Sequence, residues 1–210
     1  VDSKEIELRV PDVSEDGSKV PVGVSSRLPG TTDIVLVVDR NPFPLVAWFD
    51  LPAGTAPQLE LGVKMGESSP VRVLVKAQGK WHQASKDVRV TLGACGGEAA
   101  PSAAEIAATR IRATVRDGVA EVRALVTHPM ENGLRTGADG ATIPAHYVRE
   151  LSVSSADKVV LRARWGVSVS RNPLLTLRYQ PAAPGDTVNV AWIDNRGQQR
   201  RDEAKLRSAV

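Results

Sequence analysis

The chain has 210 residues, 42% hydrophobic and 24% charged, a composition typical of a folded globular protein and not of a disordered one. Its net charge of +3, from 27 Lys and Arg against 24 Asp and Glu, is too small to indicate a nucleic-acid-binding protein. The single cysteine excludes an internal disulfide and a multi-cysteine metal site, and no apolar run approaches the ~20 residues that cross a membrane.

The first half of the chain carries a series of strand signals. Residues 5–10 alternate polar and apolar side chains, which is the period of a half-buried β-strand. Residues 33–38 are β-branched and almost wholly apolar, as in a central strand. Residues 71–76 and 88–92 alternate again, and Gln78, Gly79 and Lys80 between them predict a turn.

The segment between the two halves has a different pattern. Residues 98–109 are rich in alanine, and Ser102 is followed three residues later by Glu105, the arrangement of a capping box at a helix start. We interpret residues 98–109 as a partly helical linker between two domains, which then comprise residues 1–97 and 110–210.

The second half of the chain carries the same kind of strand signals as the first. Further strands are predicted at residues 111–115, 119–126, 148–153, 159–165, 174–179 and 188–193. Many short strands separated by Gly, Pro, Asn and Asp predict an all-β chain of two Ig-like antiparallel β-sandwich domains. Residues 198–207 are dominated by charged side chains and are predicted to form a solvated tail.

A short tetrapeptide recurs between the halves. Residues 39–42, Asp-Arg-Asn-Pro, resemble residues 170–173, Ser-Arg-Asn-Pro, and each follows an apolar run. Arg-Asn-Pro is a common way to leave a strand, since proline breaks the hydrogen-bond ladder and asparagine forms tight turns. The recurrence is therefore either chance or a sign that the two sandwiches are related.

The lone cysteine, Cys95, lies among residues that cannot pack around it. It directly follows the predicted strand 88–92 and is flanked by Gly93, Ala94, Gly96 and Gly97. Such a segment has large backbone freedom and almost no side chain to bury. We therefore predict an exposed functional thiol on a thin, mobile arm, in preference to a buried hydrophobic cysteine. This arm suits the presentation of a covalently attached group better than the rigid geometry of a catalytic nucleophile.

These residues resemble a known pair of families. The Gly-Ala-Cys-Gly-Gly arm after a β-sandwich resembles SoxY, in which the chain ends in Gly-Gly-Cys-Gly-Gly, and here Ala94 replaces one glycine. The second half resembles SoxZ at residues 127–133, 143–147 and 165–173. The resemblance covers about residues 5 to 196 and identifies the chain as a fused SoxY–SoxZ sulfur carrier of the Sox thiosulfate-oxidation system. Because SoxY and SoxZ are usually separate chains, Cys95 is here tethered at both ends.

The resemblance implies a carrier and not an enzyme. Cys95 would carry S-thiosulfonate and persulfide adducts, which the haem enzyme SoxXA, the manganese enzyme SoxB and SoxCD-like enzymes make and process. The carrier itself would hold no cofactor and no metal, its two domains would pair within the chain, and its location would be periplasmic, with a leader removed. An exposed single thiol also predicts disulfide-linked dimers in air.

Other conspicuous residues have mostly structural interpretations. His82, His128 and His146 lack a partner at ligand spacing in the sequence, and the four tryptophans are expected in the core or at a domain interface. A contact surface between domains or with a partner enzyme is predicted at His128, Pro129, Met130, Glu131 and Asn132. Two alternative functions stay open: a two-domain Ig-like binding or adhesion module with an incidental thiol, and a thiol enzyme that pairs Cys95 with a histidine.

Overall fold

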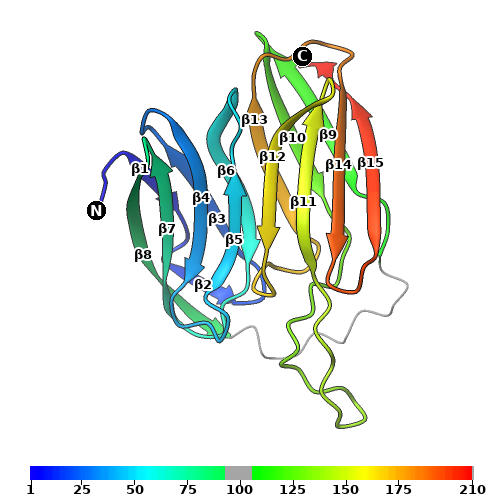
Figure 1. The fold of residues 1–210 in the computed structure, drawn as a ribbon. Helices are drawn as coiled ribbons and strands as arrows, with labels where there is room; N and C mark the ends of the chain where they lie inside the picture. The colour runs from blue at the N-terminus through cyan, green and yellow to red at the C-terminus, as the bar shows by residue number, and fades with distance from the viewer. Residues whose placement is uncertain (93–105, 210) are drawn as a thin grey trace.

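The structure is a computed structural model that describes residues 1–92 and 106–209 (Figure 1). In the first half the strands are β1 (Ile6–Arg9), β2 (Val13–Asp16), β3 (Val20–Ser26), β4 (Thr31–Val38), β5 (Leu45–Asp50), β6 (Thr55–Val63), β7 (Ser69–Ala77) and β8 (Lys80–Leu92). In the second half they are β9 (Arg110–Arg116), β10 (Val119–Leu125), β11 (Val148–Ser155), β12 (Lys158–Trp165), β13 (Leu174–Tyr179), β14 (Thr187–Asp194), β15 (Gln199–Lys205) and β16 (Arg207–Ser208). The predicted all-β, two-domain Ig-like fold is confirmed, and the described residues contain no helix.

Both sheets run without a break through the two halves. One sheet has the order β1-β3-β6-β13-β10-β9-β16, and the other has the order β15-β14-β11-β12-β5-β4-β7-β8-β2. Antiparallel pairing of β6 with β13 and of β5 with β12 joins the halves, which stand side by side in Figure 1. The edge strands that each half would otherwise expose are thereby covered by the other half.

The core follows from alternation along the strands. In β7 every second residue is buried, and β14 shows the same alternation, so each strand turns one face inward. The buried side chains form one hydrophobic cluster that includes residues of both halves, from Ile6 to Leu206. The halves therefore share a core as well as two sheets.

Backbone contacts outside the strand pairs also cross the junction. Gly166 N donates to the Val46 carbonyl over 2.7 Å, and Gln180 N donates to the Gly54 carbonyl over 2.8 Å. Gly54 has a φ of +94°, which favours glycine, and a Cβ there would clash with the Gln180 carbonyl oxygen. This close approach of the two chains requires glycine.

Several sequence predictions are corrected by the structure. Strands β2, β3, β5, β6, β15 and β16 were not predicted. The solvated tail predicted at residues 198–207 is wrong, because β15 pairs with β14 along its whole length and Leu206 is buried. One face of β15 lies in solvent and carries charged side chains, which is why its sequence resembles that of a solvated tail. In the predicted linker, residues 98–105 lie outside the described residues, and residues 106–109 are not helical.

The structure also bears on the predictions for the tryptophans and for the recurring Arg-Asn-Pro segment. Trp165 and Trp192 are buried as predicted, but Trp81 is 40% exposed near the start of β8. The two Arg-Asn-Pro segments lead into different sheets, since β5 lies in the nine-stranded sheet and β13 in the seven-stranded one. Among the described residues, none forms a helix with the length and hydropathy of a membrane span.

Candidate functional site

The predicted attachment residue Cys95 and its arm residues Gly93, Ala94, Gly96 and Gly97 lie outside the described residues. The structure shows the strand that leads to them. Parallel pairing of β2 with β8 continues to Leu92, whose carbonyl accepts a hydrogen bond of 2.8 Å from Gly17 N. The side chain of Thr91 also donates to the Glu15 carbonyl, over 3.0 Å. The last described residue before the arm is therefore held in the sheet.

Hydrogen bonds also fix the chain at Thr109, on the other side of the cysteine segment. Thr109 N donates to Asp202 Oδ2 over 2.8 Å, and Trp192 Nε1 donates to Thr109 Oγ1 over 3.2 Å. Burial raises the pKa of Asp202, but hydrogen bonds from Arg200 and Thr109 outweigh it and hold that pKa below its usual value. Leu92 and Thr109 are thus two structural anchors, one in each half, on either side of the cysteine segment.

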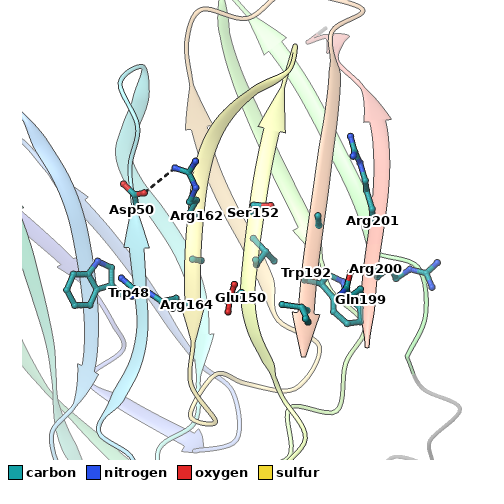
Figure 2. Close-up of a pocket in the computed structure, with 14 residues that line it drawn as sticks. Trp48, Asp50, Glu150, Ser152, Arg162, Arg164, Trp192, Gln199, Arg200 and Arg201 are labelled. Carbon is teal, nitrogen blue, oxygen red and sulfur yellow. Dashed lines mark hydrogen bonds and ion pairs between the residues drawn. The ribbon is translucent and has the colours of Figure 1, made fainter. Parts of the chain in front are cut away.

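A groove of about 740 Å³ spans the two halves (Figure 2). Its lining comes from β5 of the first half and from β12, β11, β14 and β15 of the second. The charged lining residues are Arg162, Arg164, Arg200, Arg201, Asp50 and Glu150. The excess of arginine makes the groove more favourable for anionic groups than for cationic ones.

Aromatic and charged side chains at one end of the groove connect neighbouring strands of the nine-stranded sheet. The Arg164 guanidinium lies 4.9 Å from the Trp48 ring centre, so a cation–π contact joins β12 to β5. Trp48 Nε1 donates to Asp33 Oδ1 over 2.8 Å, and the ring meets Trp81 edge to face at 5.8 Å. Arg162 pairs with Asp50 at 3.4 Å across the same strand junction (Figure 2). The two halves therefore touch on this face through side chains as well as backbone.

A half-buried lysine ties the end of β6 to the second half. Lys64 Nζ donates to the carbonyl oxygens of Met130 and, over 3.1 Å, of Val167. Burial lowers the pKa of Lys64 to about 8; the charge of Arg135 acts in the same direction, and that of Glu131 opposes it. Met130 belongs to the segment in which the sequence predicted a contact surface, and its carbonyl makes a contact between the halves.

The pKa of Lys64 predicts a rise in stability at alkaline pH. An unfolded lysine keeps its proton up to about pH 10.5, whereas folded Lys64 loses it near pH 8, so the unfolded state binds more protons between these values. The free energy of unfolding gains on the order of 3 kcal/mol from this group across that interval. Urea denaturation from pH 7 to 10.5 should show the wild type gaining on Lys64→Met by this amount.

The matched control for this measurement is Lys80→Met. Lys80 is an exposed lysine beside the β7–β8 turn, and its replacement should leave the pH dependence of the wild type unchanged. The comparison with Lys64→Met also cancels other alkaline titrations, such as that of Tyr179, whose pKa is raised by burial. A constant difference between wild type and Lys64→Met over this pH range would contradict the prediction.

The loop between β10 and β11 is fixed at its base by an ion pair. Arg135 Nη2 contacts Glu131 Oε2 at 2.6 Å, and the backbones of Glu131 and His146 exchange hydrogen bonds of 2.7 and 2.9 Å. Burial raises the pKa of Glu131, but the hydrogen bond and charge of Arg135 outweigh it and lower that pKa. Of the predicted contact surface, His128, Met130 and Glu131 are buried, while Pro129 and Asn132 are half-buried.

Two histidines meet one aspartate beneath this loop. His146 Nε2 lies 2.8 Å from Asp194 Oδ2, His128 Nε2 lies 3.6 Å from the same oxygen, and the imidazole ring centres are 4.7 Å apart. Burial lowers the pKa of His128 to about 4, and the neighbouring His146 adds to this effect. Burial raises the pKa of Asp194, but hydrogen bonds from His146 and the backbone outweigh it and lower the net value.

The sequence did not predict this cluster. The three residues are 18 and 48 positions apart, so no ligand spacing is visible, and His82 lies elsewhere, on β8. Only the pairing of β11 with β14 brings His146, just before β11, to the end of β14 where Asp194 lies.

Comparisons with known proteins identify two families in this chain. Residues 1–95 match the family described as sulfur oxidation protein SoxY, and residues 109–205 match the family described as sulphur oxidation protein SoxZ. No match is found among curated protein sequences.

The solved structures similar to this chain include a carrier. The sulfur carrier protein SoxY from Chlorobium limicola f thiosulfatophilum is 34% identical, with 44% of this chain and 84% of that one covered and a TM-score of 0.41. A superoxide reductase (neelaredoxin) from Ignicoccus hospitalis is 16% identical over 40% of this chain and 79% of that one, with a TM-score of 0.37. A beta-glycosidase from Bacteroides vulgatus is 10% identical over 95% of this chain and 24% of that one, with a TM-score of 0.31.

Proposed function

The chain belongs to the SoxY and SoxZ families, fused in one polypeptide with a role in sulfur oxidation, and from this premise we propose that it carries sulfur intermediates covalently on Cys95. The observation that carries the proposal is the position of the chain's single cysteine. Cys95 is the last residue of the SoxY match, inside Gly-Ala-Cys-Gly-Gly and three residues after β8 ends. One attachment point is sufficient for a carrier.

The chemistry assigned to Cys95 is that of a thiolate. Loading forms a sulfur–sulfur bond between the cysteine and the terminal sulfur of thiosulfate, giving Cys–S–S–SO₃⁻ with the loss of one proton and two electrons to a haem enzyme. Hydrolysis then releases sulfate and two protons and leaves the persulfide Cys–S–S⁻. Because the thiolate is the reactive form, its pKa and exposure control the rate of loading.

The division of labour in this proposal places the catalysis on other proteins. SoxXA, SoxB and SoxCD-like enzymes supply oxidation and hydrolysis, and the carrier brings its adduct to each of them, in the periplasm. The two anchors on either side of the cysteine segment, Leu92 in the first half and Thr109 in the second, support a tethered mode of presentation. The reach of Cys95 is then limited by the segment between the anchors.

Intact-mass spectrometry tests the proposal directly. The wild-type chain is incubated with thiosulfate and a SoxXA-type enzyme, and then with a SoxB-type enzyme. We expect the mass to increase by one thiosulfate-derived group and then to decrease by the sulfonate part, leaving one additional sulfur atom. Peptide mapping should place both adducts on the peptide that contains Cys95. A folded chain that gains no adduct under conditions that load a two-chain carrier would overturn the proposal.

A further inference from the structure

Exposed apolar side chains gather at the end of the molecule where the cysteine segment begins. Among the described residues, seven large hydrophobic side chains are exposed, and four of them lie at this end. They are Val13 on β2 (51% exposed), Phe43 before β5 (46%), Leu45 at the start of β5 (53%) and Leu92 at the end of β8 (71%). Figure 1 shows β2 and the end of β8 at the lower end of the molecule. We refer to these four residues as the apolar end surface.

A series of hydrogen bonds connects the two parts of the apolar end surface. Gly17 N donates to the Leu92 carbonyl over 2.8 Å, and Met65 N donates to the Gly17 carbonyl over 2.8 Å. The backbone nitrogen of the residue before Met65 donates to the Ser168 carbonyl over 2.7 Å, and Ser168 Oγ donates to the Phe43 carbonyl over 2.8 Å. Loops of both halves are therefore fixed between Leu92 and Phe43, so the fold supports this surface from within.

A hollow of about 380 Å³ lies between the two parts of the surface. Val13 and Arg89 line it from the β2–β8 pair, and Arg40 lines it from the loop that contains Phe43. Arg40 Nη1 donates to the Ser68 carbonyl over 3.3 Å, which holds this loop beside the hollow. A pocket bordered by exposed apolar side chains is the form in which a protein interface receives an anchoring side chain of its partner.

The position of Cys95 brings a partner enzyme to this end. Leu92 is held in the sheet and Cys95 is three residues later, so their Cα atoms are at most about 11 Å apart. The reacting centre of an enzyme that modifies Cys95 must therefore come close to Leu92, and the protein around that centre must lie against the neighbouring surface. We propose that the apolar end surface is the docking surface for the enzyme that loads Cys95, which contacts it with an apolar rim around its active-site entrance. This inference rests on the proposed carrier function and deepens it.

Apolar contact is the chemistry that this end of the molecule offers a partner. Apolar side chains that gather at one place and are bordered by polar residues mark the contact sites of proteins. The charges that line the hollow cancel, since it holds Arg40 and Arg89 together with Asp12 and Asp87. Burial of the four apolar side chains by the enzyme stabilises the complex in proportion to the area removed from water. The surface therefore favours an apolar partner over one selected by its charge.

Loading kinetics with a purified SoxXA-type enzyme test this proposal. The concentration of the full-length chain is varied at saturating thiosulfate, and loading is followed by intact-mass spectrometry. In the double variant Phe43→Ala, Leu45→Ala we expect KM for the chain to rise about tenfold or more and kcat to change less than about twofold, because docking is weakened and the thiol is unchanged. Both substitutions lie at least 50 positions from Cys95 in the sequence, so neither alters the cysteine segment itself.

The matched control is Trp81→Ala. It removes an aromatic side chain of similar exposure, 40%, at the start of β8, the end of that strand opposite to Leu92. Its KM should equal that of the wild type. Circular dichroism and the rate at which iodoacetamide alkylates Cys95 should be the same for all three chains, which shows that the fold and the thiol are intact.

The outcomes that would overturn the proposal are specific. They are an unchanged KM in the double variant, an equal rise in KM for Trp81→Ala, and a dimer of the Cys95→Ser chain in analytical ultracentrifugation that the double substitution abolishes. The dimer would assign the apolar end surface to a second copy of the chain. A wild-type chain that the enzyme does not load would contradict the carrier function itself, and with it this inference, so the two failures are distinguishable.

Discussion

Replacing Cys95 by serine is expected to abolish loading of the chain with thiosulfate-derived sulfur. A cysteine thiol has a pKa of about 8.5 and supplies reactive thiolate near neutral pH, whereas a serine hydroxyl does not ionise there and forms no sulfur–sulfur bond. Because the chain has no second cysteine, no other thiol can replace the lost one. Intact-mass spectra after incubation with thiosulfate and a SoxXA-type enzyme should show the adduct on the wild type and the unmodified mass for Cys95→Ser.

Two control variants show whether the loss of loading in Cys95→Ser is specific to the thiol. Ala94→Gly gives the arm the Gly-Gly-Cys-Gly-Gly sequence of SoxY and should load at least as well as the wild type. His82→Asn should also load normally, which would argue against a thiol enzyme that uses this histidine. Disulfide-linked dimers should form in air from the wild type and from both control variants, which keep Cys95, but not from Cys95→Ser. An adduct on Cys95→Ser would show that sulfur is attached elsewhere, and the carrier proposal would be wrong.

Replacing Phe49 by alanine is expected to lower the free energy of unfolding by about 3–5 kcal/mol, the usual cost of removing a large buried aromatic side chain. Phe49 is fully buried on β5, the strand through which the nine-stranded sheet passes between the halves. It lies opposite Ile34 of β4 and Ala163 of β12. The cavity left by its ring therefore weakens packing on both sides of the junction.

Because the core is one cluster, this substitution should destabilise both halves together. Urea denaturation followed by circular dichroism and by tryptophan fluorescence should give a single transition, shifted to lower urea concentration. Trp48 and Trp81 report on the first half, and Trp165 and Trp192 report on the second. Two transitions of which only one moves would contradict a shared core.

The matched control is the other phenylalanine of the chain. Phe43 is 46% exposed in the loop before β5, and its backbone carbonyl, not its ring, accepts the hydrogen bond from Ser168. Phe43→Ala should therefore change the free energy of unfolding by no more than about 0.5 kcal/mol. A loss comparable to that of Phe49→Ala would show that the ring of Phe43 is packed in solution.

A strand could be predicted from the sequence where the signals that define it lie within a few neighbouring residues. Strand β13 was predicted with its exact bounds because it alternates and is bounded by Pro173 and by Pro181, residues that break strands. Strands β3 and β6 were missed because proline and glycine interrupt their alternation, and β5 was missed because it follows Pro42 and Pro44 directly; pairing with neighbouring strands keeps all three extended. The charged strand β15 was missed for a related reason, since one of its faces is covered only by tertiary packing.

The candidate functional residues also differ in whether the signal for them is local in the sequence. A lone cysteine among glycines is a local signal, readable without any knowledge of pairing. The hydrogen bonds from Lys64 to the second half and the meeting of His128, His146 and Asp194 are not local. These contacts join residues between 18 and 103 positions apart, so no window of sequence contains them.

The sequence by itself determined the fold class, the family resemblance and the position of the single cysteine, because alternation, turn residues and short motifs act over a few neighbouring residues. Only the tertiary structure decided that the two halves are one body of two continuous sheets. The physical reason is that β5 with β12 and β6 with β13 pair through backbone hydrogen bonds, which any two strands of suitable length can form. Which strands meet is selected by the burial of the shared core, and that choice brings Lys64 to the junction of the halves and His128, His146 and Asp194 together beneath the β10–β11 loop.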